Sequence, residues 1–282
     1  MITDQETNVV FVADTLKGKF PSVYGGLKSI LEHHGIPLRI IPGTKDIWCR
    51  DYMPIQVSEE KFVQFRYKPD YLSGKYRRLR ADGEIGLGLP WLRGYRCSEI
   101  VLDGGNVVKW SDGVILTEKV LTENPGWGRG KLLAELRRLL EVDRVILIPS
   151  EPGDLTGHAD GIVRFVDGAR VIVNDYRRVD RIFGSTLERI LKDVGLNLTK
   201  VPYRPRAGRY LNMPPATGNY INFLQVSRLI VLPVHGLPED GRTIRTVADA
   251  YEGVQICPLE ASALAEEGGV HNCITWCVAQ KE

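Results

Sequence analysis

Residues whose types and spacing could do chemistry lie in four short stretches, and the last of these contains a candidate nucleophile. Cys273 follows the pair Gly268-Gly269 and precedes an apolar run that favours a strand, so a glycine loop could present its side chain to a pocket. A thiolate attacks well only with a lowered pKa and a partner, and His271 and His158 are the candidates. A buried structural cysteine is the alternative.

The second stretch combines a histidine with an aspartate. His158 and Asp160 are two residues apart at the predicted start of a strand, so their side chains are expected to project to one face. An imidazole beside a carboxylate can act as a proton shuttle. The alternative is a turn histidine beside a solvated aspartate.

The other two stretches could bind a planar cation. If residues 48–51 form a strand, Trp48 and Arg50 face one side and Asp51 the other. An indole face and a carboxylate would then form a binding wall, and a surface strand with an Arg–Asp pair is the alternative. Asp103 precedes two glycines, either in a plain tight turn or at a pocket edge.

The composition indicates an ordinary globular protein. The chain has 282 residues, of which 43% are hydrophobic and 26% charged, and its net charge of +2 does not indicate a nucleic-acid or membrane partner. Five cysteines without a CxxC pair suggest a reducing compartment. The polar start without a signal peptide and the lack of an 18-residue apolar run lead us to expect a cytoplasmic protein.

The elements that must position these residues repeat in a strand–helix–strand order. The pattern predicts about five such units of roughly fifty residues and an α/β fold. Helices are predicted from Pro21 up to Gly35 and at residues 131–140, 181–194 and 243–251. Strands are predicted at residues 8–13, 38–41, 55–57, 61–66, 100–102, 107–108, 114–116, 145–149, 169–173, 219–223, 228–233, 254–256 and 274–276.

Taken together and in order, the four motifs resemble the guanidine-modifying, or pentein, superfamily. They are WxRDxxP at Trp48–Pro54, LDGGN at Leu102–Asn106, GHxDGxxRF at Gly157–Phe165 and GGxxxCxT at Gly268–Thr275. Within the superfamily the chain is similar to the agmatine deiminase and Porphyromonas-type peptidylarginine deiminase family. NYINF at Asn219–Phe223 agrees with the family pattern, and the resemblance covers essentially the whole chain.

The resemblance implies one domain over residues 1–282, a five-bladed α/β propeller of ββαβ modules around a central pocket. It also implies that Cys273 is the nucleophile, His158 the proton shuttle, and Asp51 and Asp160 the carboxylates that hold a guanidinium. Trp48 matches a pocket wall. The residues expected to contact substrate are Trp48, Arg50, Asp103 and Gly269, with Arg50 as the candidate reader of a substrate carboxylate.

The implied reaction is hydrolysis of an agmatine- or arginine-like guanidine to a ureido product and ammonia, as in putrescine formation. A guanidinium is a planar cation that two carboxylates can orient, and thiolate attack on its carbon would give a covalent thiouronium. This chemistry needs no metal or other cofactor. We therefore expect the protein to bind a small guanidine substrate and to bind neither a membrane nor nucleic acid. Assembly into a homo-oligomer is compatible with this reaction.

Some positions depart from the family pattern and keep alternatives open. Asn272 stands where many deiminases have histidine, Cys49 lies inside the first motif, and LDGGN has an aspartate where agmatine deiminases usually have glutamate. The alternatives are an amidinotransferase, which needs the same Cys–His–Asp set, and a non-catalytic binding module. Basic segments at 77–80 and 204–209 are the support for the latter.

Overall fold

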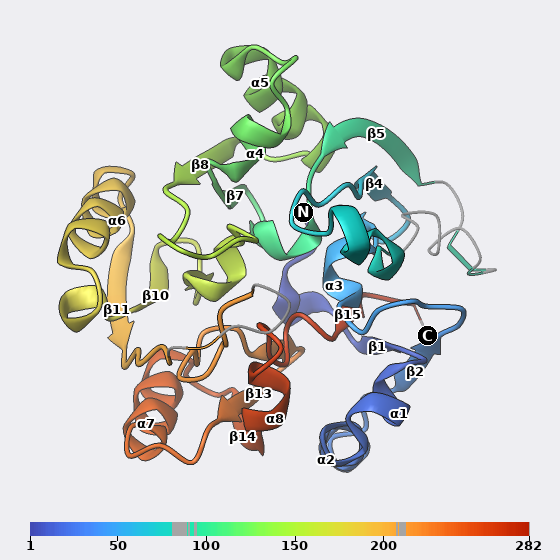
Figure 1. Cartoon of the computed structure of the whole chain (residues 1–282), viewed down its shortest axis with the longest axis vertical. Helices are drawn as coiled ribbons and strands as arrows, with labels where there is room; N and C mark the ends of the chain where they lie inside the picture. The colour runs from blue at the N-terminus through green and yellow to red at the C-terminus, as the bar shows by residue number, and fades with distance from the viewer. Residues whose placement is uncertain (81–88, 90, 93–94, 207, 209–212, 282) are drawn as a thin grey trace.

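Five small sheets surround a common centre. The computed structural model describes residues 1–80, 89, 91–92, 95–206, 208 and 213–281. Figure 1 shows the sheets radiating from the middle of the molecule, with α2, α5, α6 and α7 at the outer rim. In every sheet the middle strand is antiparallel to the first strand and parallel to the third. Parallel neighbours require a crossover, which explains why helices recur between the second and third strands.

Each sheet is one ββαβ module. The sheet that contains the N-terminal strand is made of β15 (Trp276–Val278), β1 (Val9–Ala13) and β2 (Leu38–Ile41), with α1 (Leu16–Lys19) and α2 (Pro21–His33) as its crossover and η1 (Asp4–Glu6) before it. The next sheet has β3 (Ile55–Gln56), β4 (Phe62–Arg66) and β5 (Arg96–Val101), with η2 (Gly74–Leu79) between the last two.

The other three modules follow the same plan. The third has β6 (Val108–Lys109), β7 (Gly113–Thr117) and β8 (Arg144–Ile148), with α4 (Lys119–Glu123) and α5 (Arg129–Leu140). The fourth has β9 (Val163–Phe165), β10 (Arg170–Asn174) and β11 (Asn197–Val201), with η6 (Tyr176–Arg178) and α6 (Arg181–Asp193). The fifth has β12 (Leu224–Val226), β13 (Leu229–Val234) and β14 (Gln255–Glu260), with α7 (Asp240–Ala250), and α8 (Ser262–Ala265) follows it.

A short turn precedes the first strand of every module, and these turns position the candidate site. They are α3 (Cys49–Tyr52) before β3, η4 (Gly104–Asn106) before β6, η5 (Ala159–Gly161) before β9, and the turns at 219–223 and 271–274 before β12 and β15. Since the modules are arranged around one centre, equivalent turns converge there (Figure 1). Motifs that are more than two hundred residues apart thus meet through the repeat of the fold.

The chain closes the ring by pairing its two ends. Strand β15 is antiparallel to β1, with Val10 opposite Cys277, and the Asn8 backbone N–H donates to the carbonyl of Val278 at 2.9 Å. Cys49 ties α3 to the same region, because its thiol donates to the carbonyl of Ile274 at 3.2 Å. The loop that carries Cys273 is therefore anchored on both sides.

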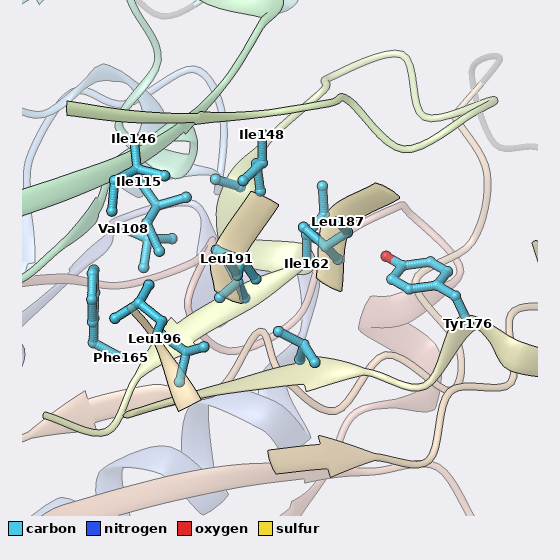
Figure 2. Close-up of a cluster of buried hydrophobic side chains, with 14 of the residues drawn as sticks. Val108, Ile115, Ile146, Ile148, Ile162, Phe165, Tyr176, Leu187, Leu191 and Leu196 are labelled. Atoms are coloured by element: carbon cyan, nitrogen blue, oxygen red, sulfur yellow. The ribbon is translucent and has the colours of Figure 1, made fainter. Parts of the chain in front are cut away.

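The first, third, fourth and fifth modules each pack their sheet against a helix through apolar side chains. Figure 2 shows the cluster in which Leu187 and Leu191 of α6 face residues of the third and fourth modules. These leucines are the apolar stripe predicted for residues 181–194, and each buried leucine contributes about 1.5–3 kcal/mol to folding. Side chains from β6 and β7 enter the same cluster, so the helix also joins neighbouring modules.

The structure corrects three of the predicted strands. Residues 48–51 form the helical turn α3, and residues 219–223 form turns because the Asn219 side chain accepts a hydrogen bond from the Ile221 backbone N–H at 3.2 Å. His158 and Asp160 do not begin a strand either: Gly157 has a φ of +61°, η5 follows, and β9 begins only at Val163. The polar, half-exposed strand β11 was not predicted. No helix in the described part of the chain is long and apolar enough to cross a membrane.

Candidate active site

A cavity of about 570 Å³ lies where the central turns meet. Among the sequence-predicted site residues, six line it and two do not. Those that line it are Trp48, Asp51, His158, Asp160, Gly269 and Cys273. Arg50 and Asp103 lie behind this wall. A 570 Å³ cavity is of the size that holds a small organic molecule.

Cys273 is partly exposed in the turn before β15. Its Sγ donates to Oδ1 of Asn222 at 3.2 Å and lies 3.8 Å from Oδ2 of Asp160. Burial, followed by the charges of Asp160 and Asp51, holds the pKa of this thiol well above its usual range. Cys273 is therefore a neutral thiol in the free protein, and a cation bound between the two carboxylates would lower its pKa.

Two buried carboxylates face this thiol from different modules. Asp160 is 3% exposed, and its Oδ2 accepts a hydrogen bond from Nδ2 of Asn272 at 2.7 Å. Asp51 is 8% exposed, and its Oδ1 accepts the Gly105 backbone N–H at 3.0 Å. Burial, together with the other site carboxylates, raises the pKa of Asp51 to about 7, although the charge of His158 opposes this. Such a pair favours a cationic ligand.

His158 is held between two aspartates. Its Nε2 lies 3.2 Å from Oδ2 of Asp103, and its Nδ1 lies 3.6 Å from Oδ1 of Asp51. Burial disfavours the charged ring, but Asp51 and Asp103 outweigh burial and raise the pKa of His158 to about 10. Tyr71 adds a hydrogen bond of 2.9 Å to Oδ2 of Asp103. The imidazole is thus fixed in orientation and can hold a proton at neutral pH.

Two glycines give these groups the space they need. A Cβ on Gly269 would lie 2.6 Å from the Trp48 ring and 3.2 Å from Cβ of Cys273. A Cβ on Gly105 would lie 2.5 Å from Nδ1 of His158 and 2.6 Å from Oδ1 of Asp51. Because Gly269 has no side chain, the Trp48 indole can pack against the loop that carries Cys273. Gly105 likewise lets the His158 imidazole and the Asp51 carboxylate approach each other.

Arg50 and Asp103, expected to contact substrate, take other places. The Arg50 backbone N–H donates to the carbonyl of Cys273 at 3.2 Å, and its Nε donates to the carbonyl of Asn272 at 3.3 Å. This placement does not suit a reader of a substrate carboxylate, because the helical turn points the guanidinium away from the cavity. Arg50 instead joins α3 to the loop that carries Asn272 and Cys273. Asp103 acts on His158 rather than lining the cavity.

His271 is not the partner of Cys273. Its ring is fully buried, and Nδ1 lies 3.3 Å from the carbonyl of Val231. Burial lowers the pKa of His271 to about 4, so the ring is neutral at ordinary pH. Cys49 is also fully buried, which suits its structural contact with Ile274. Of the two candidate histidines, His158 alone lines the cavity.

Three residues of the site were not assigned from the sequence. Asn222 accepts a hydrogen bond from the Cys273 thiol, Asn272 donates to Asp160, and Tyr71 donates to Asp103. Asn222 lies inside the NYINF pattern, which was the available signal for it. Tyr71 lies in a polar stretch without a motif, so nothing in its surroundings pointed to the site.

The cavity extends to a second group of polar side chains. Glu151 lines it and accepts hydrogen bonds from the hydroxyls of Tyr176 at 2.7 Å and Tyr203 at 2.5 Å. Burial raises the pKa of Glu151 to about 7. Asp46 also lines the cavity, and burial raises its pKa to about 6. The described residues contain no cluster of three or more side chains suited to a metal ion.

Comparison with known proteins gives a consistent family. The profile of the Porphyromonas-type peptidyl-arginine deiminase family matches residues 2–278. An agmatine deiminase of Stutzerimonas stutzeri is 27% identical over 273 residues, covering 82% of this chain and 74% of its own. The solved agmatine deiminase of C. jejuni superposes with a TM-score of 0.80 at 16% identity, over 99% of this chain and 95% of that one.

A third relative shows how far the fold extends. An amidinotransferase of Microseira wollei superposes with a TM-score of 0.64 at 12% identity, over 100% of this chain and 97% of its own. At these identities the structural likeness shows the fold alone. The five-bladed propeller expected from the motifs is thereby confirmed.

Proposed function

Because the chain belongs to the Porphyromonas-type peptidyl-arginine deiminase family, and is accordingly a hydrolase of amidine C–N bonds, we propose that it deiminates a small guanidine compound with Cys273 as nucleophile. One observation supports this most: the thiol of Cys273 and the carboxylates of Asp51 and Asp160 line the same cavity from three modules. A guanidinium carbon held between two carboxylates would lie beside the sulfur, which is how proximity and charge accelerate such a step.

The chemistry follows from the charges already described. Substrate enters as a cation and binds to Asp51 and Asp160, which lowers the pKa of Cys273, so that the thiol releases its proton to solvent water and becomes a thiolate. The thiolate attacks the guanidinium carbon and forms a C–S bond. His158 donates a proton to one nitrogen, the C–N bond breaks, and ammonia leaves a covalent thiouronium. Water, deprotonated by His158, then attacks the same carbon, and the C–S bond breaks to give the ureido product and free Cys273.

Two acidic side chains of the cavity wall favour a substrate with a second positive group. Glu151 and Asp46 are buried carboxylates whose charge an ammonium would stabilise. Lys19, Lys45 and Arg206 line the cavity too; Lys19 pairs with Glu267, and Arg206 pairs with Glu266. A similar protein is an agmatine deiminase, and agmatine carries a guanidinium and an ammonium at its two ends. We therefore propose an agmatine-like diamine over free arginine, whose carboxylate would face these acids.

The test is release of ammonia from a panel of guanidines. The panel contains agmatine, free arginine, methylated arginines, short guanidino acids and an arginine peptide, each given to wild type and Cys273→Ala. Agmatine is expected to give ammonia and a ureido product in equal amounts, and Cys273→Ala is expected to give neither. A rapid acid quench of wild type is expected to trap a mass adduct on the peptide that contains Cys273.

Two results would contradict the proposal in different ways. Turnover that survives in Cys273→Ala would remove the covalent mechanism. Ammonia release only when a candidate amine is added, with the amidino group found on that amine, would make the protein a transferase. A preference for arginine over agmatine would leave the reaction standing and overturn the substrate class.

A further inference from the structure

A second, much smaller cavity lies among the central segments and is lined by two cations. Arg50, Lys109 and Cys277 border it, with a volume of about 20 Å³. None of its lining residues lines the active-site cavity. The volume is close to one water-sized sphere, so it can hold a single water or a monatomic ion but no organic molecule.

Positive charge exceeds negative charge around this small cavity. Arg50, Lys109 and Arg164 surround one carboxylate, that of Asp4. Arg164 binds Asp4 directly at 2.6 Å, whereas Lys109 Nζ lies 3.4 Å from the other carboxylate oxygen. Burial disfavours the charge of Asp4, but these three cations outweigh burial and hold its pKa below the usual range. The three cations share Asp4, and Asp160 is the second carboxylate that acts on Arg50. Three positive charges therefore face two negative charges, and Lys109, whose pKa burial lowers, is left without a full counter-charge.

The hydrogen-bonding capacity of these two cations is largely unused. The side chain of Lys109 is 8% exposed, and Asp4 is its single ion-pair partner within the described chain. Arg50 has five N–H donors, of which Nε reaches the carbonyl of Asn272 at 3.3 Å and Nη2 lies 3.9 Å from the thiol of Cys277. A largely buried ammonium such as that of Lys109 is costly without a partner, and Arg50 is half-buried beside it, so donors that border this cavity call for an acceptor.

We propose that this cavity is a binding site for a small monovalent anion, with chloride as the fitting species, held by Lys109 and Arg50. A halide offers the missing negative charge and accepts several hydrogen bonds at once, which a neutral water does only in part. The cavity volume of about 20 Å³ is too small for a carboxylate or a phosphate ion. The site is separate from the active site, and it reaches the nucleophile loop through Arg50, which binds the carbonyls of Asn272 and Cys273.

The experiment compares thermal unfolding of the full-length protein in sodium chloride and in sodium gluconate at equal ionic strength. Gluconate is too large for the cavity, so the comparison separates binding from screening. Wild type is expected to unfold about 2–4 °C higher in chloride, since a ligand that binds the folded state alone stabilises it. Lys109→Met is expected to lose this increment. The matched control Lys61→Met removes a charge from an exposed pair with Glu141 and is expected to keep it.

A second measurement does not depend on how well the variant folds. Crystals of wild type soaked in sodium bromide are expected to show an anomalous peak between Lys109 Nζ and the Arg50 guanidinium. Equal unfolding temperatures of wild type in the two salts, or an equal chloride increment in folded Lys109→Met, would overturn the proposal. A bromide map without a peak at this position would overturn it as well.

Discussion

The side-chain amide of Asn272 donates a 2.7 Å hydrogen bond to Oδ2 of Asp160, the same oxygen that lies 3.8 Å from Sγ of Cys273. The residue next to Cys273 thus fixes the carboxylate that faces its thiol. Arg50 holds the carbonyl of Asn272 from the other side, so α3, η5 and the nucleophile loop are joined at one point. The candidate site is therefore a set of turns held together by hydrogen bonds.

Asn272 is expected to act by positioning Asp160. Asn272→Ala removes a hydrogen bond to a charged group and should lower kcat/KM by roughly tenfold to a hundredfold. Asn272→Asp should be worse than Asn272→Ala, because it places a second carboxylate against Asp160. Steady-state kinetics with the best substrate of the panel measures this, and Asn197→Ala, at an exposed strand position, is the control. Equal activity of the alanine and aspartate variants would mean that Asn272 only fills space.

Alkylation should reveal that a bound cation activates the thiol. Because burial and the site carboxylates raise the pKa of Cys273, neutral iodoacetamide should modify it slowly near pH 7 and faster as pH rises. Cationic 2-chloroacetamidine should react quickly near pH 7, since it occupies the place between Asp51 and Asp160. Rates are read from the mass of the peptide containing Cys273, because Cys97 is exposed and reacts as well.

The control for this experiment changes the carboxylate and not the thiol. Asp160→Asn should remove most of the advantage of the cationic reagent and leave the iodoacetamide rate unchanged or higher. If both reagents showed the same pH profile in wild type, activation by the bound cation would be refuted.

Protonation of His158 should stabilise the fold below neutral pH. Its folded-state pKa is about 10, above the unfolded value of about 6.5, so the proton binds more tightly in the folded state. This stabilisation is complete below pH 6.5 and is lost as pH rises from 6.5 through 10. Between these limits the free energy of unfolding of wild type should fall, relative to that of His158→Gln, by up to about 5 kcal/mol. Denaturant unfolding at several pH values measures this difference, and parallel curves would contradict it.

Gly269 should tolerate no side chain. The Cβ of Gly269→Ala would overlap the Trp48 ring at 2.6 Å, so either the indole or the loop of Cys273 must move. Overpacking of this kind costs about 1–3 kcal/mol of stability, and activity should fall by at least about tenfold. Gly126→Ala is the matched control, because nothing lies within 4 Å of its new Cβ. Denaturant unfolding curves measure the loss of stability, and kcat/KM measures the loss of activity. If Gly269→Ala had the stability and kcat/KM of wild type, the close contact with Trp48 would be contradicted.

The residues with distinctive chemistry were predictable from the sequence, whereas their supports were not. Cys273, His158, Asp51 and Asp160 stand out because few residue types can perform these roles and the motifs flank them with glycine. A supporting residue acts on a side chain of another part of the chain. Asn222 contacts Cys273 and Tyr71 contacts Asp103 only once the fold has brought these segments together. Arg50 was expected to read substrate, but a helical turn replaces the strand assumed for residues 48–51 and reverses where its side chain points.

The same limit applies to the fold. Amphipathic helices such as residues 181–193 were predicted because their apolar stripe has a clear period, and the repeat of strand–helix–strand units gave the number of modules. The short turns before the first strands have no such period. Residues 219–223 look like a strand by propensity, yet the Asn219 side chain binds the local backbone and turns the chain. Residues 207 and 209 of the basic segment 204–209 lie outside the described residues.

Glu151 is expected to select substrates by their distal charge. Glu151→Gln keeps the size of the side chain and removes its charge, so kcat/KM for agmatine should fall about tenfold, while kcat/KM for free arginine stays level or rises. The effect should appear mainly in KM, because the group lies away from the reacting carbon. Tyr203→Phe is the matched control: it removes a hydrogen bond from Glu151 and keeps the carboxylate, and it should retain the preference for agmatine. An equal loss on both substrates in Glu151→Gln would show that the residue supports the cavity wall and does not read the substrate.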